Sequence, residues 1–298
     1  MMRDWVSAFR LRTLPLALAS VAMGTFLAVD AGFWDGAVFF WCCLTTALLQ
    51  VLSNLANDYG DSVHGADHAG RVGPARAVQS GKISREAMRK AVWICAAMAF
   101  ASGVITLFVA FRDEWLFIGS WLVVGLVCIG AAITYTAGRK PYGYLGLGDL
   151  SVVLFFGLVA VPGTYFLFAR SVDMHLFLPA ISCGFLAAGV LNINNIRDME
   201  SDLSAGKYSL PVRFGRPFAV AYQSFLLWAS LICLVGFLWL TGHRSFWLLL
   251  VLIPTPFLWK IGEAVSRLPS VELDPWLRKM ALTALLQTLL FGAALLLG

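Results

Sequence analysis

The polar side chains at the end of the second long apolar run are of the types that bind a divalent cation. They are Asn54, Asn57, Asp58 and Asp61. Spacings of three and four residues would place them at one end, and largely on one face, of a helix that continues through the motif. A carboxylate at membrane depth costs about 2.5–3.5 kcal/mol on insertion scales, and carboxylate and amide oxygens are ligands suited to Mg²⁺. The pattern favours a magnesium site, although a polar helix end that faces the lipid headgroups is the alternative.

A second polar group follows an apolar run in the later half of the chain. Its residues are Asn194, Asp198 and Asp202, at intervals of four. The first two lie 140 residues after Asn54 and Asp58, which is a faint internal repeat. Internal repeats in membrane proteins tend to place a shared site between the two halves. We therefore predict two pseudo-repeated halves whose Asp-rich ends face each other and hold two Mg²⁺ ions with a diphosphate between them. Two unrelated polar helix ends are the alternative.

Cationic side chains lie in the loops that this arrangement would bring to the same end. Residues 135–149 contain Arg139 and Lys140 among several glycines and tyrosines, and Pro141 ends any helix there. The loop fits an anion clamp, and it equally fits topological charge with interfacial tyrosines. Mg²⁺ together with Arg and Lys is what a diphosphate leaving group requires, because these cations stabilise the charge that develops on it. The chain has no Gly-x-x-x-x-Gly-Lys-Ser/Thr motif and no zinc-ligand spacing, so neither ATP hydrolysis nor a zinc centre is indicated.

The composition predicts a polytopic membrane protein. Of the 298 residues, 59% are hydrophobic and only 13% are charged. This leaves no room for a separate soluble domain, so we expect residues 1–298 to form a single membrane domain with the Asp motifs at 54–67 and 192–207. The six cysteines lie in apolar runs without metal-ligand spacing, and no disulfide framework is expected.

Nine apolar segments predict an all-α integral membrane bundle of nine transmembrane helices. The segments are about 14–29, 36–56, 88–110, 115–137, 149–168, 175–195, 218–240, 245–262 and 280–297. If the N-terminus is cytoplasmic, the alternation of loops places all of the 22 Lys and Arg residues on the cytoplasmic side except Arg112, Arg170 and Arg244. The positive-inside rule therefore predicts a cytoplasmic N-terminus and an external C-terminus, in the inner or plasma membrane.

The predicted cytoplasmic connections are longer than the external ones and carry nearly all of the polar chemistry. They are residues 57–87, 138–148, 196–217 and 263–279. Long loops in compact proteins are usually functional or disordered. Two of these loops begin at the Asp motifs, so we expect short helices within them to cap a cavity that opens to the cytoplasm. Ser84 is the predicted start of the helix that leads into the third span.

With these residues in view, the sequence resembles the UbiA superfamily of intramembrane aromatic prenyltransferases. The resemblance spans residues 12–215 and extends in topology to nine spans. The first family motif, Asn-Asp-x-x-Asp-x-x-x-Asp, falls on Asn57, Asp58 and Asp61, but its last Asp falls on Gly65. This departure leaves one motif carboxylate without a counterpart at its usual position.

The second family motif, Asp-x-x-x-Asp, falls on Asp198 and Asp202. Within the superfamily, the stretches around 54–67, 134–149 and 191–198 resemble the 1,4-dihydroxy-2-naphthoate polyprenyltransferases, the MenA type. Asp67 is a candidate substitute for the carboxylate that is absent at position 65.

The resemblance implies Mg²⁺-dependent prenyl transfer. A polyprenyl diphosphate would ionise to an allylic cation, which the ring of 1,4-dihydroxy-2-naphthoate attacks with loss of CO₂, giving demethylmenaquinol or demethylmenaquinone in the bilayer. Mn²⁺ is an expected substitute for the two Mg²⁺ ions. The implied metal ligands are Asn57, Asp58, Asp61, Asp198 and Asp202, and the four Asp residues are the implied catalytic groups. The implied diphosphate ligands are Arg71, Arg139, Lys140, Arg197 and Lys207. Implied substrate contacts or supporting residues are Asn54, Asp67, Tyr135, Asn194 and Asn195.

Three rival interpretations remain. The first keeps the superfamily but changes the acceptor to 4-hydroxybenzoate or homogentisate, and Gly65 argues modestly against the hydroxybenzoate type. The second is a CDP-alcohol phosphotransferase, whose Asp-rich run is compact, whereas the two motifs here are 140 residues apart. The third is a cation-coupled transporter with carboxylates near the membrane midplane. The predicted position of both motifs at cytoplasmic helix ends argues against it.

Overall fold

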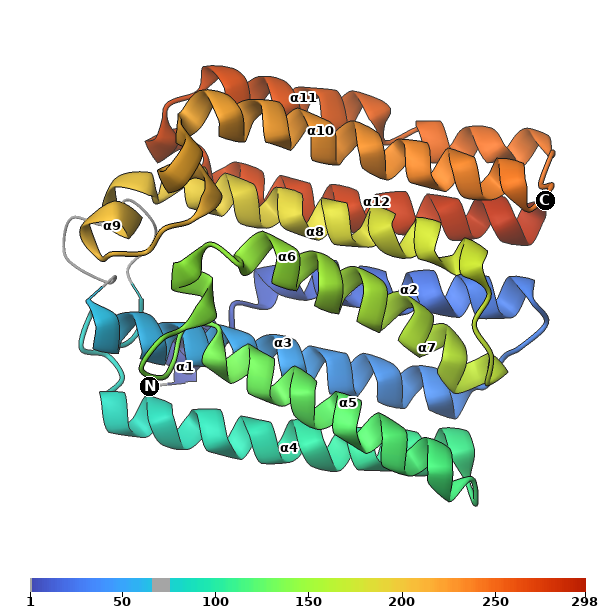
Figure 1. Cartoon of the computed structure of the whole chain (residues 1–298), viewed down its shortest axis with the longest axis horizontal. Coiled ribbons are helices and arrows are strands. Elements are labelled where there is room, and N and C mark those ends of the chain that lie inside the picture. The colour runs from blue at the N-terminus through green and yellow to red at the C-terminus, as the bar shows by residue number, and fades with distance from the viewer. Residues whose placement is uncertain (1, 66–75) are drawn as a thin grey trace.

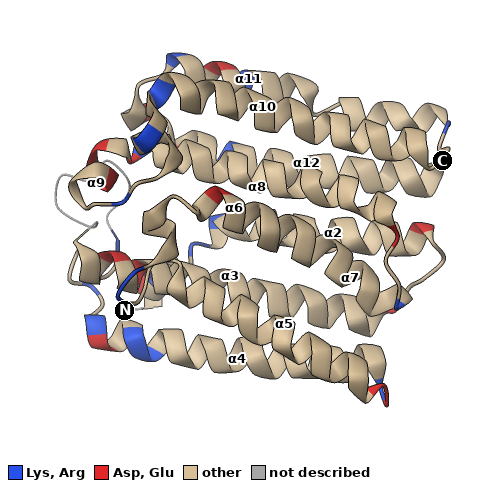
Figure 2. Ribbon diagram, viewed as in Figure 1, with Lys and Arg blue, Asp and Glu red and all other residues tan. Residues whose placement is uncertain are grey.

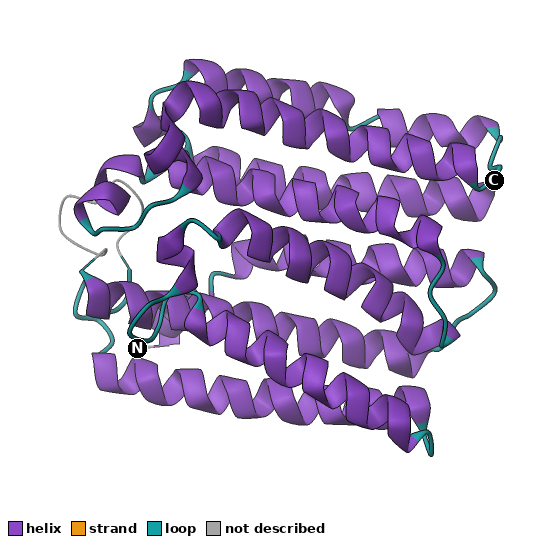
Figure 3. Ribbon diagram, viewed as in Figure 1, coloured by secondary structure: helices purple, strands orange, loops and turns teal. Residues whose placement is uncertain are grey.

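The structure is a computed structural model, and it describes residues 2–65 and 76–298. Within these ranges the chain forms a bundle of long helices with no strand (Figures 1 and 3). Nine helical segments in the described ranges are long and apolar enough to cross a membrane. The predicted all-α membrane fold and its nine spans are confirmed. The two termini lie at opposite ends of the bundle (Figure 1), as an odd number of crossings requires.

Of the spans in the described ranges, five are single α-helices and four are built from shorter pieces. The α-helices are α1 (Met2–Phe9), α2 (Leu14–Asp30), α3 (Gly36–His64), α4 (Arg85–Phe111), α5 (Trp115–Thr134), α6 (Gly148–Val152), α7 (Ala160–Ala169), α8 (Phe177–Arg197), α9 (Met199–Ser204), α10 (Leu210–Leu240), α11 (Thr255–Arg267) and α12 (Asp274–Leu297). The 3₁₀ segments are η1 (Leu11–Thr13), η2 (Tyr142–Leu145), η4 (Met174–Leu176), η5 (Phe246–Leu252) and η6 (Ser270–Glu272), and η3 (Val153–Val159) is a π-helix.

Each helix that carries an Asp motif packs against the long helix that follows it. Helix α3 packs on α4, and α8 packs on α10. Helices α2 and α12 pack against each other and against α8. This pairing agrees with the predicted two halves, although the repeat itself stays a prediction. Figure 2 shows that the Lys and Arg residues gather mainly at the end of the bundle where the N-terminus lies.

The ends of α3 explain why the first Asp motif is helical. The Asp35 carboxylate accepts hydrogen bonds from the N–H groups of Ala37 and Val38, which caps the first turn. The helix ends at Gly65, whose φ of 77° lies in the left-handed region that glycine adopts without strain. The helix therefore continues through residues 54–61, as predicted. The same geometry gives a physical reason for glycine at the position where the family motif has its last Asp.

The connection that begins at the second motif contains the short helix α9, which carries Asp202, and a short helix was predicted for that loop. Ser84 caps α4 by accepting a hydrogen bond from the N–H of Ala87, at the predicted start of that helix. Residues 66–75 of the other such connection, 57–87, lie outside the described residues, and the capping of the cavity by these two connections stays a prediction.

Gly60 lets α3 approach the chain after α5 closely. A Cβ at this position would clash with the backbone carbonyl group of Thr136. This group can move aside only if the backbone itself shifts. We expect Gly60→Ala to lower the free energy of unfolding by about 1–3 kcal/mol, although alanine is the better helix former. Gly125→Ala in α5 is the matched control, because no atom lies within 4 Å of the added methyl group. Thermal unfolding of both variants in detergent measures the difference, and equal midpoints would contradict the predicted clash.

Candidate active site

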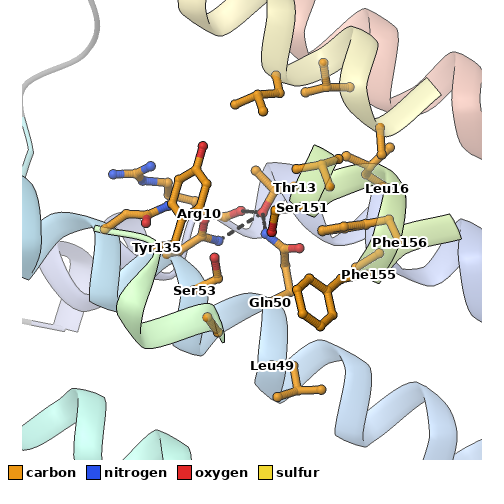
Figure 4. Close-up of a pocket in the computed structure, with 18 of the residues that line it drawn as sticks. Arg10, Thr13, Leu16, Leu49, Gln50, Ser53, Tyr135, Ser151, Phe155 and Phe156 are labelled. Atoms are coloured by element: carbon orange, nitrogen blue, oxygen red, sulfur yellow. Dashed lines mark hydrogen bonds between the residues drawn. The ribbon is translucent and has the colours of Figure 1, made fainter. Parts of the chain in front are cut away.

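A cavity of about 370 Å³ opens where the helix ends carrying the two motifs converge. Helices α2, α3, α5, α8 and α12 and the π-helix η3 line it. Leu16, Phe155 and Phe156 contribute apolar walls, and Figure 4 shows the two phenylalanines on η3. Short π-helical segments within longer helices often occur at functional sites. The cavity therefore combines an apolar interior with polar residues of both motifs.

The N-terminal arm is held against α3 by Asn54. Its amide donates hydrogen bonds to the carbonyl of Phe9, at 3.0 Å, and to the hydroxyl of Thr13, at 3.0 Å. Gln50 donates to the same hydroxyl at 3.1 Å, and Figure 4 shows Gln50 and Thr13 beside the cavity. Asn54 is 4% exposed. The predicted supporting role of Asn54 thus has a structural basis, since its contacts position the arm that carries Arg10.

Both carboxylates of the first motif are buried and paired with arginine. Arg10 donates to Asp58 at 2.6 Å, and Arg76 forms an ion pair with Asp61. Arg76 also lies 3.7 Å from Asp58. Tyr144 donates its hydroxyl to Asp61 at 2.8 Å. Burial raises the pKa of Tyr144, and the negative charge of Asp61 adds to this, so Tyr144 remains a neutral hydrogen-bond donor.

Asn57 is oriented by its neighbours at the same helix end. The Thr136 hydroxyl donates to its side-chain oxygen at 3.0 Å, and Arg76 donates to its carbonyl at 3.2 Å. Asn57 and Asp61 line the cavity, whereas Asp58 is not among its lining residues. One helix end therefore presents an amide oxygen and a carboxylate to the same space.

The second motif is organised around Arg197. Its guanidinium donates to both oxygens of Asp198, at 2.9 and 2.8 Å, and to the side-chain oxygen of Asn194 at 2.9 Å. It also pairs with Asp274 at the start of α12, and Asp274 in turn pairs with Arg12 at 3.2 Å. Only 3% of Arg197 is exposed. These bonds engage the guanidinium with the protein's own groups, a geometry typical of a positioning residue.

Asp202 and Lys207 form a buried ion pair, with the ammonium 3.1 Å from one carboxylate oxygen. Burial raises the pKa of Asp202, the Lys207 charge opposes this, and the charges of Asp198 and Asp61 raise the pKa further. Asp61 of the first motif lines the same cavity as residues of the second motif. Lys207 lines the cavity, as does Asn194. The predicted convergence of the two Asp-rich ends is therefore present in the structure.

Other predicted residues lie at varied distances from this site. Tyr135 lines the cavity, and Asn195 is buried with a side-chain oxygen that accepts no hydrogen bond from the described residues. Arg139 and Lys140 are exposed and are not among the lining residues. The predicted Asp67 and Arg71 lie outside the described residues.

The donor set is chemically suited to Mg²⁺, since it consists of carboxylate and amide oxygens. One oxygen of Asp202 lacks a hydrogen-bond donor, although Lys207 is close, and the oxygen of Asn195 lacks one too. Within residues 2–65 and 76–298, no three His, Cys, Asp or Glu side chains are arranged to hold a metal ion. Arg and Lys side chains neutralise the motif carboxylates instead. A metal ion that binds these carboxylates would therefore displace the Arg and Lys cations from them.

Sequence reasoning missed four residues that bond to the predicted site. Arg10 and Arg76 had the topological explanation of the positive-inside rule, and Tyr144 had that of an interfacial tyrosine. Asp274 lies in a connection that holds as many acidic as basic residues, three of each in 263–279, so composition gave no signal for it. Their partners lie 48, 15, 83 and 77 residues away in the sequence, which local spacing does not reveal.

Comparison with known proteins decides the family. The model of the UbiA prenyltransferase family matches residues 17–295. The chain belongs to the UbiA prenyltransferase family. It is 44% identical, over 96% of its length and 93% of the relative's, to 1,4-dihydroxy-2-naphthoate octaprenyltransferase from Escherichia coli (strain K12). The predicted family resemblance is thus confirmed.

Two solved UbiA homologues share the fold. The apo structure of a homologue from Aeropyrum pernix K1 has a TM-score of 0.68 at 17% identity, covering 97% of this chain and 98% of that one. A homologue from Archaeoglobus fulgidus, bound to GPP and Mg²⁺, has a TM-score of 0.62 at 18% identity, covering 97% and 99%. At these identities the likeness shows the UbiA fold alone.

Proposed function

We propose that this UbiA-family prenyltransferase transfers a polyprenyl group from polyprenyl diphosphate to 1,4-dihydroxy-2-naphthoate. The ring would lose its carboxylate as CO₂, which gives demethylmenaquinol in menaquinone biosynthesis; a separate two-electron oxidation by an external acceptor would convert it to demethylmenaquinone. The similarity to the Escherichia coli octaprenyltransferase over nearly the whole of both chains carries the choice of acceptor. The cavity supports it, because it joins an apolar interior to clustered carboxylates and cations.

The proposed cofactor is Mg²⁺, as two ions, with Mn²⁺ as a substitute. The side chains that would hold it are Asn57, Asp58, Asp61, Asp198 and Asp202. When bound, Mg²⁺ would stabilise the negative charge of the diphosphate as it departs. The Archaeoglobus fulgidus homologue with bound GPP and Mg²⁺ supports this choice of ion.

The protein's own cations have complementary roles in this proposal. Arg76 and Lys207 line the cavity beside the motif carboxylates, where they would neutralise the diphosphate. Lys207 belongs to the predicted diphosphate-binding set with Arg71, Arg139, Lys140 and Arg197. Arg197 would act through Asp198 by fixing the orientation of that carboxylate.

The apolar walls would bind the isoprenoid end and exclude water. Water competes with the aromatic ring for an allylic cation, so a dry cavity favours prenyl transfer over hydrolysis. Phe155, Phe156 and Leu16 supply such walls. Tyr135 lines the same cavity, and the face of its ring would stabilise positive charge there.

The proposed arrangement in the membrane follows from the charges. The end of the bundle that is rich in Lys and Arg would face the cytoplasm, with the N-terminus on that side and the C-terminus outside, in the inner or plasma membrane (Figure 2). Residues 1–298 would act as one domain, because the cavity draws its lining from both halves.

An acceptor panel tests the proposed reaction. Purified protein would receive Mg²⁺, a labelled polyprenyl diphosphate, and one of 1,4-dihydroxy-2-naphthoate, 4-hydroxybenzoate or homogentisate. We expect prenylation of the naphthoate with release of CO₂, and EDTA should abolish it because the diphosphate then lacks its counter-ions. Prenylation of a different ring would discard the naphthoate but keep the family chemistry. Cation flux in vesicles without any prenylation would favour a transporter.

A further inference from the structure

Arg278 differs from the other cations that line the cavity. The cavity-lining cations in the described residues are Arg10, Arg12, Arg76, Lys207 and Arg278. The first four form ion pairs with Asp58, Asp274, Asp61 and Asp202, respectively. Within residues 2–65 and 76–298, Arg278 makes neither an ion pair nor a side-chain hydrogen bond. It therefore borders the cavity with its hydrogen-bond donors available to a ligand.

Helix α12 directs Arg278 to the cavity and the next residue away from it. Leu277 and Ala281 line the cavity on the same part of the helix. Lys279 instead lies over the ring of Trp276, with its ammonium 3.8 Å from the ring centroid, and is not a lining residue. Arg278 is exposed, so it stands at the opening of the cavity rather than in its interior.

The surrounding charges leave this opening positive. Asp274, one helical turn before Arg278, is already shared by Arg12 and Arg197. Arg197 also forms an ion pair with Asp198. This region therefore holds three arginines and two carboxylates, namely Arg12, Arg197 and Arg278 with Asp198 and Asp274. An anion that enters beside α12 would be attracted by this excess of positive charge.

The proposed acceptor carries such an anion. Its carboxylate would be costly to place beside an apolar cavity without a counter-charge. A guanidinium matches a carboxylate with two parallel hydrogen bonds, which also fixes the orientation of the attached ring. We propose that Arg278 binds the carboxylate of the aromatic acceptor at the opening of the cavity. This inference rests on the proposed function, and it makes Arg278 a specificity-determining residue for carboxylated acceptors.

The test compares Arg278→Gln with Lys279→Gln, the matched neighbour outside the cavity. We expect Arg278→Gln to raise the KM for 1,4-dihydroxy-2-naphthoate by about 10- to 100-fold, because a charge-assisted bidentate contact is lost. The KM for the polyprenyl diphosphate should be unchanged, Arg278→Lys should restore part of the affinity, and Lys279→Gln should behave as wild type. With 1,4-dihydroxynaphthalene, which lacks the carboxylate, wild type and Arg278→Gln should have equal KM values.

Equal weakening of both acceptors, or a raised KM for the diphosphate in place of the acceptor, would overturn the proposal. An effect at Arg12→Gln with none at Arg278→Gln would also overturn it and assign the carboxylate to Arg12. A binding assay in the absence of polyprenyl diphosphate separates this inference from the proposed function. The assay measures binding of 1,4-dihydroxy-2-naphthoate to the protein through the fluorescence of the naphthoate. Weaker binding in Arg278→Gln supports the contact even where the wild type prefers another acceptor in turnover, and unchanged binding refutes it.

Discussion

Asp58→Ala is expected to lower turnover by at least ~100-fold while the protein stays folded. In the proposed mechanism Asp58 holds Mg²⁺, and without it the charge on the departing diphosphate is poorly stabilised. The fold should tolerate the change, because the side chain of its partner Arg10 is 23% exposed and can turn to water. Turnover of labelled polyprenyl diphosphate measures the first effect, and thermal unfolding in detergent measures the second.

The position of Asp198 in the second motif gives a parallel expectation. Asp198→Ala should also abolish turnover, and its partner Arg197 would retain Asp274. Asp113→Ala is the matched control, since this exposed carboxylate lies in the loop between α4 and α5, outside the cavity. Near-wild-type activity of either motif variant at limiting Mg²⁺ would be incompatible with a two-metal site.

Arg197→Ala is expected to cost about 3–5 kcal/mol of stability, because it removes two ion pairs of a buried guanidinium, the bidentate one with Asp198 and the one with Asp274. Arg267→Ala is the matched control, since that arginine forms a 2.8 Å pair with Glu263 while its side chain is 76% exposed. An exposed pair of this kind contributes about 0.5 kcal/mol or less. Denaturant titration in mixed micelles measures both changes.

The same variant separates two roles for Arg197. If it positions Asp198, added Mg²⁺ and diphosphate should recover part of the lost stability, because bound cations then compensate the carboxylate. If Arg197 instead binds the diphosphate directly, as the family resemblance implied, the variant should keep its stability and show a raised KM for the donor. A small loss of stability equal to that of Arg267→Ala would refute the positioning role.

The sequence was informative where the signal was local. Apolar runs predicted the nine spans, and the spacing of residues 54–61 predicted a helix that continues to the motif. Intervals of three and four residues suffice for such predictions because the helical repeat itself brings those side chains together. The equivalent positions of Asp58 and Asp198 likewise indicated that two distant segments meet.

The partners of these residues could not be predicted in the same way. Arg10 reaches Asp58 and Asp274 reaches Arg197 only because the helices assemble in one particular order. Arginine at a cytoplasmic helix end also has a topological explanation, which conceals a role in the site. Arg139 is exposed and is not among the residues that line the cavity, so its role in an anion clamp stays a prediction.

The volume of the cavity bears on how long the transferred chain can be. At about 370 Å³ it lies near the lower end of the ~300–1,000 Å³ typical of small-molecule sites. A bicyclic ring together with a polyprenyl chain of many units is larger than such a cavity, so the later units of a long donor would extend among the lipid chains. An active site that contacts only the first units does not measure the rest. The length of the quinone side chain would then be set by the enzyme that elongates the donor, and a cell supplying a shorter diphosphate would obtain a shorter quinone from the same protein.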